Sequence, residues 1–152
     1  LHRIGMKIAI VSGGFTYFTD RLQRELGIDH AFSNELEIVD GRLSGRLVGL
    51  PIDRPAKADI LRRVAVTEGI PLDQTVAIGD GANDLDMLAT AGLGIAFNAK
   101  PVVRDAADTP VSGPYLDAIL FLLGIRREEV EAADDADGQR YASAPVEGLP
   151  PV

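Results

Sequence analysis

The densest group of residues able to do chemistry lies at residues 79–84, which read Gly-Asp-Gly-Ala-Asn-Asp. They directly follow the apolar run 75–78, which predicts a buried strand. The two glycines permit tight turns beside Asp80, so the pattern places a carboxylate at the mouth of a strand, where a hard cation can bind. Asn83 and Asp84 then begin a predicted helix, where amide and carboxylate groups are favoured by capping and by the helix dipole. A strand-turn-helix connection with acidic capping explains a lone Gly-Asp-Gly equally well, so the specificity comes from the whole string.

Two further groups have the composition of a phosphate-binding site. Ser12, Gly13 and Gly14 follow the apolar run 7–11, so a hydroxyl and exposed backbone N–H groups lie where a predicted strand ends. Such N–H groups can hold phosphate oxygens. Lys57 lies near the start of a predicted helix, where a cation opposes the helix dipole unless an anion is close. Taken singly, the first group is also ordinary turn composition, and the second is also an ordinary surface lysine.

Strands and helices alternate along the chain. Asp40-Gly41 between two extended runs predicts a β-hairpin. Alternating apolar strands and helices indicate an α/β fold, with a Rossmann-like, doubly wound parallel sheet covered on both faces. Ligands bind such sheets at the carboxyl ends of the strands, where residues 12–14 and 79–84 lie. The hydrophobic pattern predicts strands over 7–11, 34–39, 42–50, 75–78 and 93–97, and helices over 15–26, 56–68, 83–91, 102–107 and 115–123.

The composition is that of an ordinary globular domain, and it excludes several kinds of site. The 152 residues are 46% hydrophobic and 25% charged, so we expect one domain with a real core. The absence of cysteine excludes thiol nucleophiles, disulfides and iron–sulfur ligation. A net charge of −8 disfavours nucleic acid as a partner, and no apolar run approaches the roughly 20 residues that span a bilayer. We expect a core over residues 1–125, with the hairpin at about 34–50, and an acidic, disordered tail over 126–152 after a short helical start.

Taken together and in this order, the three groups resemble the motifs of the haloacid dehalogenase (HAD) superfamily of phosphotransferases. Residues 12–15 are similar to its second motif, Lys57 to its third and residues 79–84 to its fourth. Within the superfamily, the chain most resembles the phosphoserine phosphatase family, from residue 1 to about residue 123. Residues 34–37, the Asp40-Gly41 hairpin and residues 91–101 add to that resemblance.

The resemblance implies hydrolysis of L-phosphoserine to L-serine and phosphate in two steps, through an aspartyl-phosphate. It implies that Ser12 and the Gly13 N–H hold phosphate oxygens. Lys57 would neutralise the charge of those oxygens and of the nucleophile, and Asn83 would orient Lys57 or contact phosphate or substrate. These roles suit phosphoryl transfer, which depends on positioning and charge neutralisation more than on new covalent chemistry.

The same resemblance implies Mg²⁺ as the cofactor, bound by Asp80. Asp84 would not bind the metal directly but would hold a water molecule that is bound to it. A dianionic substrate that approaches an acidic protein needs both the metal and Lys57 to offset repulsion. The implied role in amino-acid metabolism, together with the lack of an export signal among these residues, predicts a cytoplasmic enzyme of serine biosynthesis whose partner is a small phosphomonoester. We also expect a homodimer.

One part of the family pattern is not found among these residues. The first motif is a strand followed by Asp-x-Asp-x-Thr, whose first Asp is the nucleophile and whose second is the general acid and base. Asp135-Ala136-Asp137 follows no apolar strand and lacks the Thr. We therefore expect the nucleophile, the first strand of the sheet and the family's cap segment to lie upstream in a longer protein, and the 152 residues alone to be inactive.

Three alternatives share the observed motifs. A HAD phosphatase of another small phosphoester, such as a sugar phosphate, has the same motifs and differs only in its cap. A P-type ATPase domain shares the string at 79–84, but no membrane segment follows Leu123. A noncatalytic domain that binds phosphate-bearing ligands or a partner would explain why the first motif is absent. It would not explain why Lys57 and Asp80 are both present, because a domain without catalysis does not need the two together.

Overall fold

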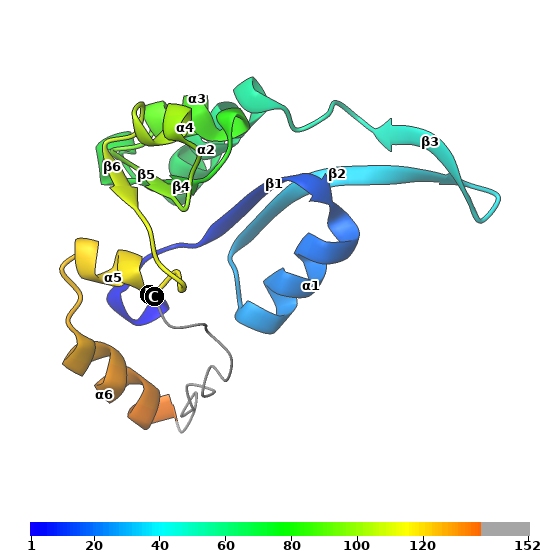
Figure 1. Cartoon of the computed structure of the whole chain (residues 1–152). Helices are drawn as coiled ribbons and strands as arrows, with labels where there is room; N and C mark the ends of the chain where they lie inside the picture. Colours follow the sequence, from blue (N-terminus) through cyan, green and yellow to red (C-terminus); the bar gives the residue numbers. More distant parts are fainter. Residues whose placement is uncertain (138–152) are drawn as a thin grey trace, which may run out of the picture. The chain divides into compact units, whose positions relative to one another are not determined.

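The computed structural model describes residues 1–137 and confirms the α/β fold. The chain divides into two compact units, Leu1–Ser112 and a second that begins at Gly113. In the first unit the strands form two three-stranded sheets rather than the single sheet that the sequence predicts (Figure 1). One sheet has the order β1-β2-β3 and the other β4-β5-β6. The strands are β1 (Ala9–Phe15), β2 (His30–Val39), β3 (Arg42–Val48), β4 (Val76–Gly79), β5 (Leu93–Phe97) and β6 (Thr109–Val111).

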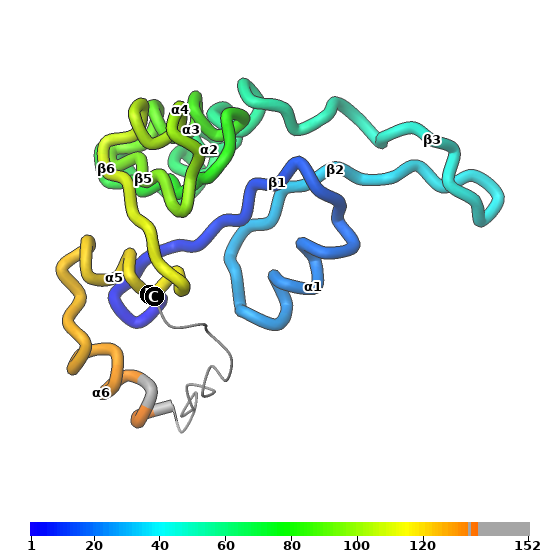
Figure 2. The backbone as a smooth tube through the Cα atoms, in the orientation of Figure 1, coloured from blue at the N-terminus to red at the C-terminus, as the bar shows by residue number. Residues whose placement is uncertain are grey.

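All neighbouring strands are parallel except the β2–β3 pair, which is the predicted hairpin. Asp40 and Gly41 have φ angles of 51° and 74°, the left-handed values that a tight two-residue hairpin turn requires. The backbone trace in Figure 2 follows the chain out along β2, around this turn and back along β3. β6 was not predicted, because three residues that include Pro110 give no alternating pattern.

In the part of the chain that the structure describes, β1 pairs only with β2, and β4 pairs only with β5. Each of these two strands therefore has one edge whose N–H and C=O groups have no strand beside them. Val11 of β1 nevertheless packs against the same apolar cluster as Ala77 of β4. Ile78 of β4 remains 38% exposed, which is unusual for the middle of an apolar parallel strand.

The helices of the first unit begin and end at local signals. The Asp53 side chain accepts a hydrogen bond from the Ala56 N–H and caps α2. Gly27 and Gly69 end α1 and α2 with φ angles of 66° and 67°. The helix predicted over 83–91 is a short 3-10 turn at Ala82–Asp84 followed by a shorter helix, because the loop must first turn back toward α2. The helices are α1 (Thr16–Leu26), α2 (Arg54–Glu68), α3 (Leu85–Thr90) and α4 (Pro101–Arg104), with 3-10 turns at His2–Ile4 and Leu72–Gln74.

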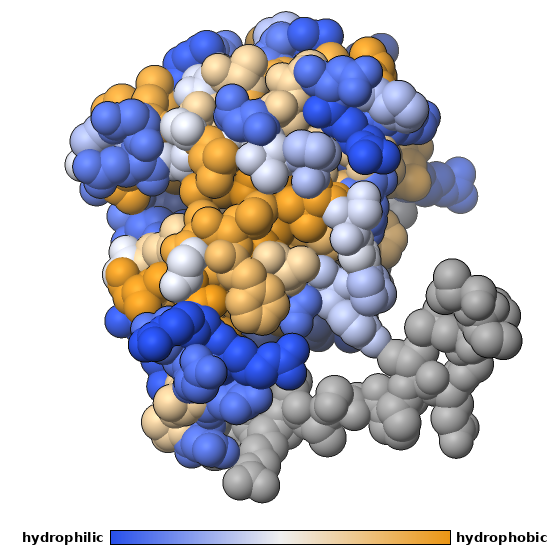
Figure 3. All heavy atoms as spheres, turned by 60° about the vertical axis from the view of Figure 1, so that its left-hand side comes forward, coloured by the Kyte–Doolittle hydropathy of each residue, from blue (hydrophilic) through white to orange (hydrophobic). Residues whose placement is uncertain are grey.

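A small apolar core holds α3 and α4 against the second sheet. Leu88 and Val103 are almost completely buried within it, beside Ala77 and Ala96. Many large apolar side chains are exposed, and Figure 3 shows one face of the molecule on which such side chains reach the surface. Exposed apolar area of this kind commonly marks a surface that another segment or partner covers.

The second unit contains α5 (Ala118–Leu122) and α6 (Arg127–Asp137). α6 lies where the sequence predicts a short helical start to the tail. The rest of the predicted tail, residues 138–152, lies outside the described residues. Among the described residues, no helix combines the length and the hydropathy needed to cross a membrane.

Candidate active site

The centre of the site is a buried ion pair between Lys57 and Asp84. Lys57 lies in the first turn of α2, and Asp84 ends the 3-10 turn after β4. The Lys57 Nζ donates to Asp84 Oδ1 at 2.6 Å, and both side chains are only 6% exposed. Burial of two charged groups is stable only when they are paired and hydrogen-bonded, so each of them fixes the position of the other.

The second carboxylate oxygen of Asp84 organises the loop after β4. Asp84 Oδ2 accepts from the backbone N–H groups of Asp80, at 3.3 Å, and of Gly81, at 3.1 Å. Gly79 is required because of space: a Cβ at Gly79 would lie 2.4 Å from the Asp84 Cβ. Neither Gly79 nor Gly81 has a positive φ. One carboxylate therefore holds the lysine and shapes the loop at the same time.

Asp80 and Asn83 are exposed on that loop. The Asp80 carboxylate makes no hydrogen bond or ion pair within residues 1–137, so it is free to bind a cation from solution. No group of three or more His, Asp or Glu side chains gathers as a metal site in the described part of the chain. A cation at Asp80 would therefore take its remaining ligands from water, from a substrate or from residues outside this part.

Ser12 and Gly13 lie in a bulge of β1 rather than in a loop after it. β1 pairs with β2 at Val11 and again at Phe15, with an irregular register between them. Ser12 Oγ accepts a hydrogen bond from the Gly14 N–H at 2.9 Å. Because its oxygen is the acceptor in this bond, the Ser12 hydroxyl proton is left to donate to another group. The bulge thus presents a hydroxyl donor and exposed backbone N–H groups at the carboxyl end of β1, as an anion site requires.

The structure brings only some of the predicted site residues into direct contact. Lys57, Asp84 and the Asp80 backbone are joined by hydrogen bonds. No hydrogen bond in the described residues joins Ser12 to Lys57, and the partner that orients Lys57 is Asp84 rather than Asn83. No local pattern indicated the Lys57–Asp84 pair, because its members lie 27 positions apart and α2 must first pack beside the β4 loop.

A second ion pair lies one turn from the first, at the exposed rim of the site. The Arg54 guanidinium donates through both Nε and Nη2 to Asp86 Oδ1, and it joins the start of α2 to the start of α3. The Asp86 hydrogen bond raises the pKa of Arg54 above its ordinary value. The pair is about half exposed, so it contributes little stability by itself.

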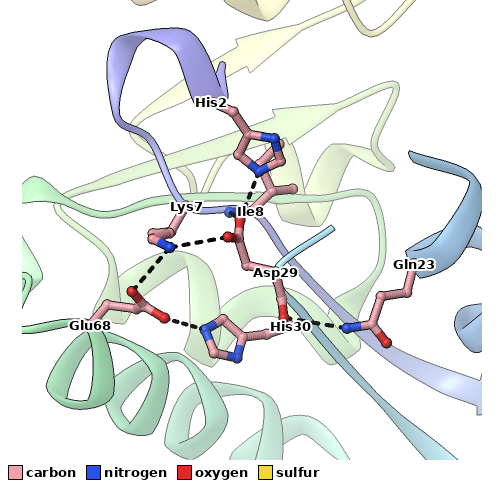
Figure 4. Close-up of polar contacts among 7 residues, drawn as sticks. All are labelled: His2, Lys7, Ile8, Gln23, Asp29, His30 and Glu68. Carbon is pink, nitrogen blue, oxygen red and sulfur yellow. Dashed lines mark hydrogen bonds and ion pairs between the residues drawn. The ribbon is translucent and has the colours of Figure 1, made fainter. Parts of the chain in front are cut away.

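A further polar cluster surrounds Asp29, at the opposite ends of β1 and β2 from Ser12 (Figure 4). Asp29 Oδ2 accepts from the Ile8 N–H at 2.8 Å and bonds the His2 ring, and Oδ1 accepts from Lys7. The Ile8 N–H is the main reason why the pKa of the Asp29 carboxyl lies well below its usual range, and the His2 hydrogen bond adds to the effect. Since ligands bind at the carboxyl ends of parallel strands, we assign this cluster to stability.

Glu68, at the end of α2, completes the same cluster. It bonds His30 at 2.6 Å and pairs with Lys7 at 3.6 Å, and the His30 hydrogen bond is the main cause of its lowered pKa. An open groove of about 460 Å³ begins at His30 and runs along the second half of α2, where the Arg63 guanidinium lies 5.5 Å from the Phe32 ring centre. None of the predicted site residues lines this groove.

Comparisons with known proteins show which family this chain resembles. Residues 1–89 match the family of haloacid dehalogenase-like hydrolases. A phosphoserine phosphatase of Streptomyces coelicolor is 66% identical over 134 residues, which are 88% of this chain and 33% of that protein. The solved structure of a probable phosphoserine phosphatase from Vibrio cholerae has a TM-score of 0.78 and 45% identity, over 88% of this chain and 41% of that one. A substrate-bound phosphoserine phosphatase complex has a TM-score of 0.74 and 43% identity, over 80% of this chain and 58% of that one.

The chain thus spans about a third of the length of its Streptomyces coelicolor relative. The structural similarity to these phosphatases confirms the HAD-like, Rossmann-type core. Because the family match covers residues 1–89, which include Ser12, Lys57 and Asp84, the chain belongs to the haloacid dehalogenase-like hydrolases.

Proposed function

We propose that the protein to which this chain belongs hydrolyses L-phosphoserine to L-serine and phosphate. The observation that carries the proposal is the buried Lys57–Asp84 pair, attached through Asp84 to the Asp80 loop, in a chain that is 66% identical to a phosphoserine phosphatase. A lysine held at the carboxyl ends of the strands provides the fixed positive charge that a phosphate dianion needs.

The proposed reaction has two steps. An aspartate oxygen attacks phosphorus, and the serine oxygen leaves with a proton from a general acid. Water then attacks the phosphorus of the aspartyl-phosphate, which releases phosphate and restores the aspartate. A solved structure of a phosphoserine phosphatase with an analogue of a phospho-aspartyl intermediate, 44% identical to this chain, supports that route.

Residues of this chain would bind and orient the phosphate. Ser12 has a hydroxyl proton to donate, and the Gly13 N–H lies in the same exposed bulge. Lys57 is held by Asp84, so its charge is fixed in place before substrate arrives and little reorganisation is needed during the reaction. Asn83 is exposed on the neighbouring loop, where it can contact phosphate or the amino-acid part of the substrate.

The donor set fits Mg²⁺ in part. Mg²⁺ prefers oxygen ligands and is commonly held by one or two carboxylates together with water and substrate phosphate. Asp80 supplies one unpaired carboxylate. Asp84 already binds Lys57 and the loop through its two oxygens, so it would not bind the ion directly but would hold a water molecule bound to it. When bound, the ion would neutralise negative charge on the phosphate.

We further propose that the nucleophilic aspartate precedes these residues in the protein. β1 and β4 each have one edge without a partner in the described residues, although both strands contact the same core. A strand between them would pair with both edges and cover Ile78, and its carboxyl end would then lie beside Ser12 and Asp80. The greater length of the relatives supports such an upstream segment.

The substrate chemistry also suggests the setting of the reaction. Because the product of the proposed reaction is serine, we propose that the reaction takes place in the cytoplasm, as part of the formation of serine. We expect the protein to act on this small molecule as a homodimer.

The test is phosphate release by the full-length protein from L-phosphoserine, compared with a panel of sugar phosphates and phosphoglycolate, with and without Mg²⁺. Strong preference for L-phosphoserine supports both reaction and substrate. Preference for another ester keeps the reaction and rejects the substrate. If no ester is hydrolysed, magnesium-dependent binding of beryllofluoride distinguishes an intact aspartate site from a noncatalytic domain, because the adduct forms on the nucleophile.

A further inference from the structure

The side chain of Asn34 joins two parts of the site through hydrogen bonds. Asn34 lies in β2, at the point where the pairing of this strand changes from β1 to β3. Its Nδ2 donates to the Gly13 carbonyl at 2.8 Å, and its Oδ1 accepts from the Ile52 N–H at 2.8 Å. The orientation of the amide is fixed by chemistry, because a carbonyl can only accept and an N–H can only donate.

The first of these bonds acts on the peptide unit between Gly13 and Gly14. That peptide is held at both ends: its carbonyl accepts from Asn34, and its N–H donates to Ser12 Oγ at 2.9 Å. Hydrogen bonds at the two ends of one peptide unit strengthen each other. Since two glycines place little restriction on this stretch of backbone, these two bonds decide which way the peptide faces and where the Ser12 hydroxyl points.

The second bond reaches the segment that begins α2. Ile52 immediately precedes Asp53, the residue that caps α2, and Lys57 lies in the first turn of that helix. The Ile52 carbonyl lies 3.6 Å from the position that a Cβ on Gly13 would occupy, so the bulge and the start of α2 are in close contact. One amide therefore fixes the phosphate-binding bulge relative to the helix that carries Lys57.

We propose that Asn34 is a positioning residue, which sets the Ser12–Gly14 bulge so that the Ser12 hydroxyl and the Lys57 ammonium act on the same phosphate group. The catalytic consequence of this inference rests on the proposed function. It does not depend on the identity of the phosphoester, because the contacts involve only the phosphate-binding part of the site. Asn34 itself need not touch the substrate.

The test uses the full-length protein and a double-mutant cycle. Asn34→Leu removes both bonds at similar volume, and Asn34→Asp keeps the acceptor for Ile52 but loses the donor to Gly13. We expect Asn34→Leu to lower kcat/KM by between about 10-fold and about 100-fold. In a Ser12→Ala background the same change should have a smaller effect than in the wild-type background, because its route through Ser12 is gone and only the Gly13 N–H of the bulge remains to be positioned.

Ser33→Ala is the matched control. Ser33 precedes Asn34 in β2, and its hydroxyl bonds Thr19 of α1 rather than the bulge. We expect this variant to lose some stability and to keep wild-type kcat/KM. Equal losses of activity in Ser33→Ala and Asn34→Leu would show a general structural role and overturn the inference, as would a full loss for Asn34→Leu in the Ser12→Ala background.

Two further measurements do not require turnover. Amide exchange at Gly14 should be faster in Asn34→Leu and Asn34→Asp than in wild type or Ser33→Ala. The affinity for inorganic phosphate should fall in the same two variants. Unchanged Gly14 exchange or unchanged phosphate affinity overturns the inference, whether or not the wild-type protein hydrolyses L-phosphoserine. An inactive wild-type protein would instead reject the proposed function.

Discussion

Replacing Asp84 by Asn is the most direct test of the buried ion pair. The substitution keeps the shape of the side chain and removes its charge, so Lys57 is left 5% exposed without a counter-ion. The site needs acceptors at both oxygens, because Oδ1 faces the Lys57 Nζ and Oδ2 faces two backbone N–H groups. An amide has only one acceptor, so Asn must point its NH₂ at a donor whichever way it turns.

The expected cost follows from the geometry. At the observed 2.6 Å, unit charges attract by about 6 kcal/mol if the effective dielectric constant is about 20. Desolvation of both groups offsets most of that attraction, so the intact pair has a small net contribution. Removing one partner loses the attraction and keeps the desolvation cost of the other. We therefore expect Asp84→Asn to lower the free energy of unfolding by about 3–5 kcal/mol.

The assay is urea unfolding followed by far-UV circular dichroism, on the full-length protein. The double variant Lys57→Met/Asp84→Leu should be less destabilised than the sum of its single variants, because it leaves no unpaired charge. Arg21→Met is the control, since the Arg21–Glu25 pair has a 2.7 Å contact but lies exposed on α1. It should cost less than about 1 kcal/mol. An equally small effect of Asp84→Asn would refute the reasoning.

Three further predictions concern local features of the fold. Gly79→Ala should destabilise by about 1–3 kcal/mol, since its Cβ would overlap the Asp84 Cβ; Gly81→Ala, measured in the same urea titration, should cost less because its Cβ meets only the end of a flexible side chain. Asp53→Ala removes the cap of α2 and should cost about 1 kcal/mol by thermal unfolding, with no change in the cooperativity of the transition. The lowered pKa of Asp29 stabilises the folded state fully above the unfolded pKa of about 3.9, and this stabilisation is lost as the pH falls toward the folded-state pKa. Asp29→Asn should therefore weaken the dependence of unfolding on pH below about pH 4, and an unchanged acid-side slope would contradict this assignment.

Patterns within a few residues were predictable from the sequence. β5 was predicted at its observed residues, the hairpin turn lies at Asp40-Gly41 as predicted, and α1 and α2 end at the predicted residues, just before Gly27 and Gly69. These features depend on backbone sterics and on hydrophobic periodicity, which neighbouring residues determine. The motifs at residues 12–14, 57 and 79–84 were likewise recognisable from residue type and order.

Contacts between distant residues required the tertiary structure. Nothing local indicated that Asp84 would pair with Lys57, or that Asn34 would join Gly13 to Ile52. The division of the strands into two sheets was not predictable either. The apolar pattern of a strand indicates that the strand is buried, but it does not indicate which strand lies beside it. The sequence by itself therefore determined the elements and the chemical groups of this protein. The packing of α2 against the β4 loop and the β1 bulge decided which of those groups act together. A buried charged or polar group is stable only when it is hydrogen-bonded, and its partners come from residues that only the tertiary structure brings close.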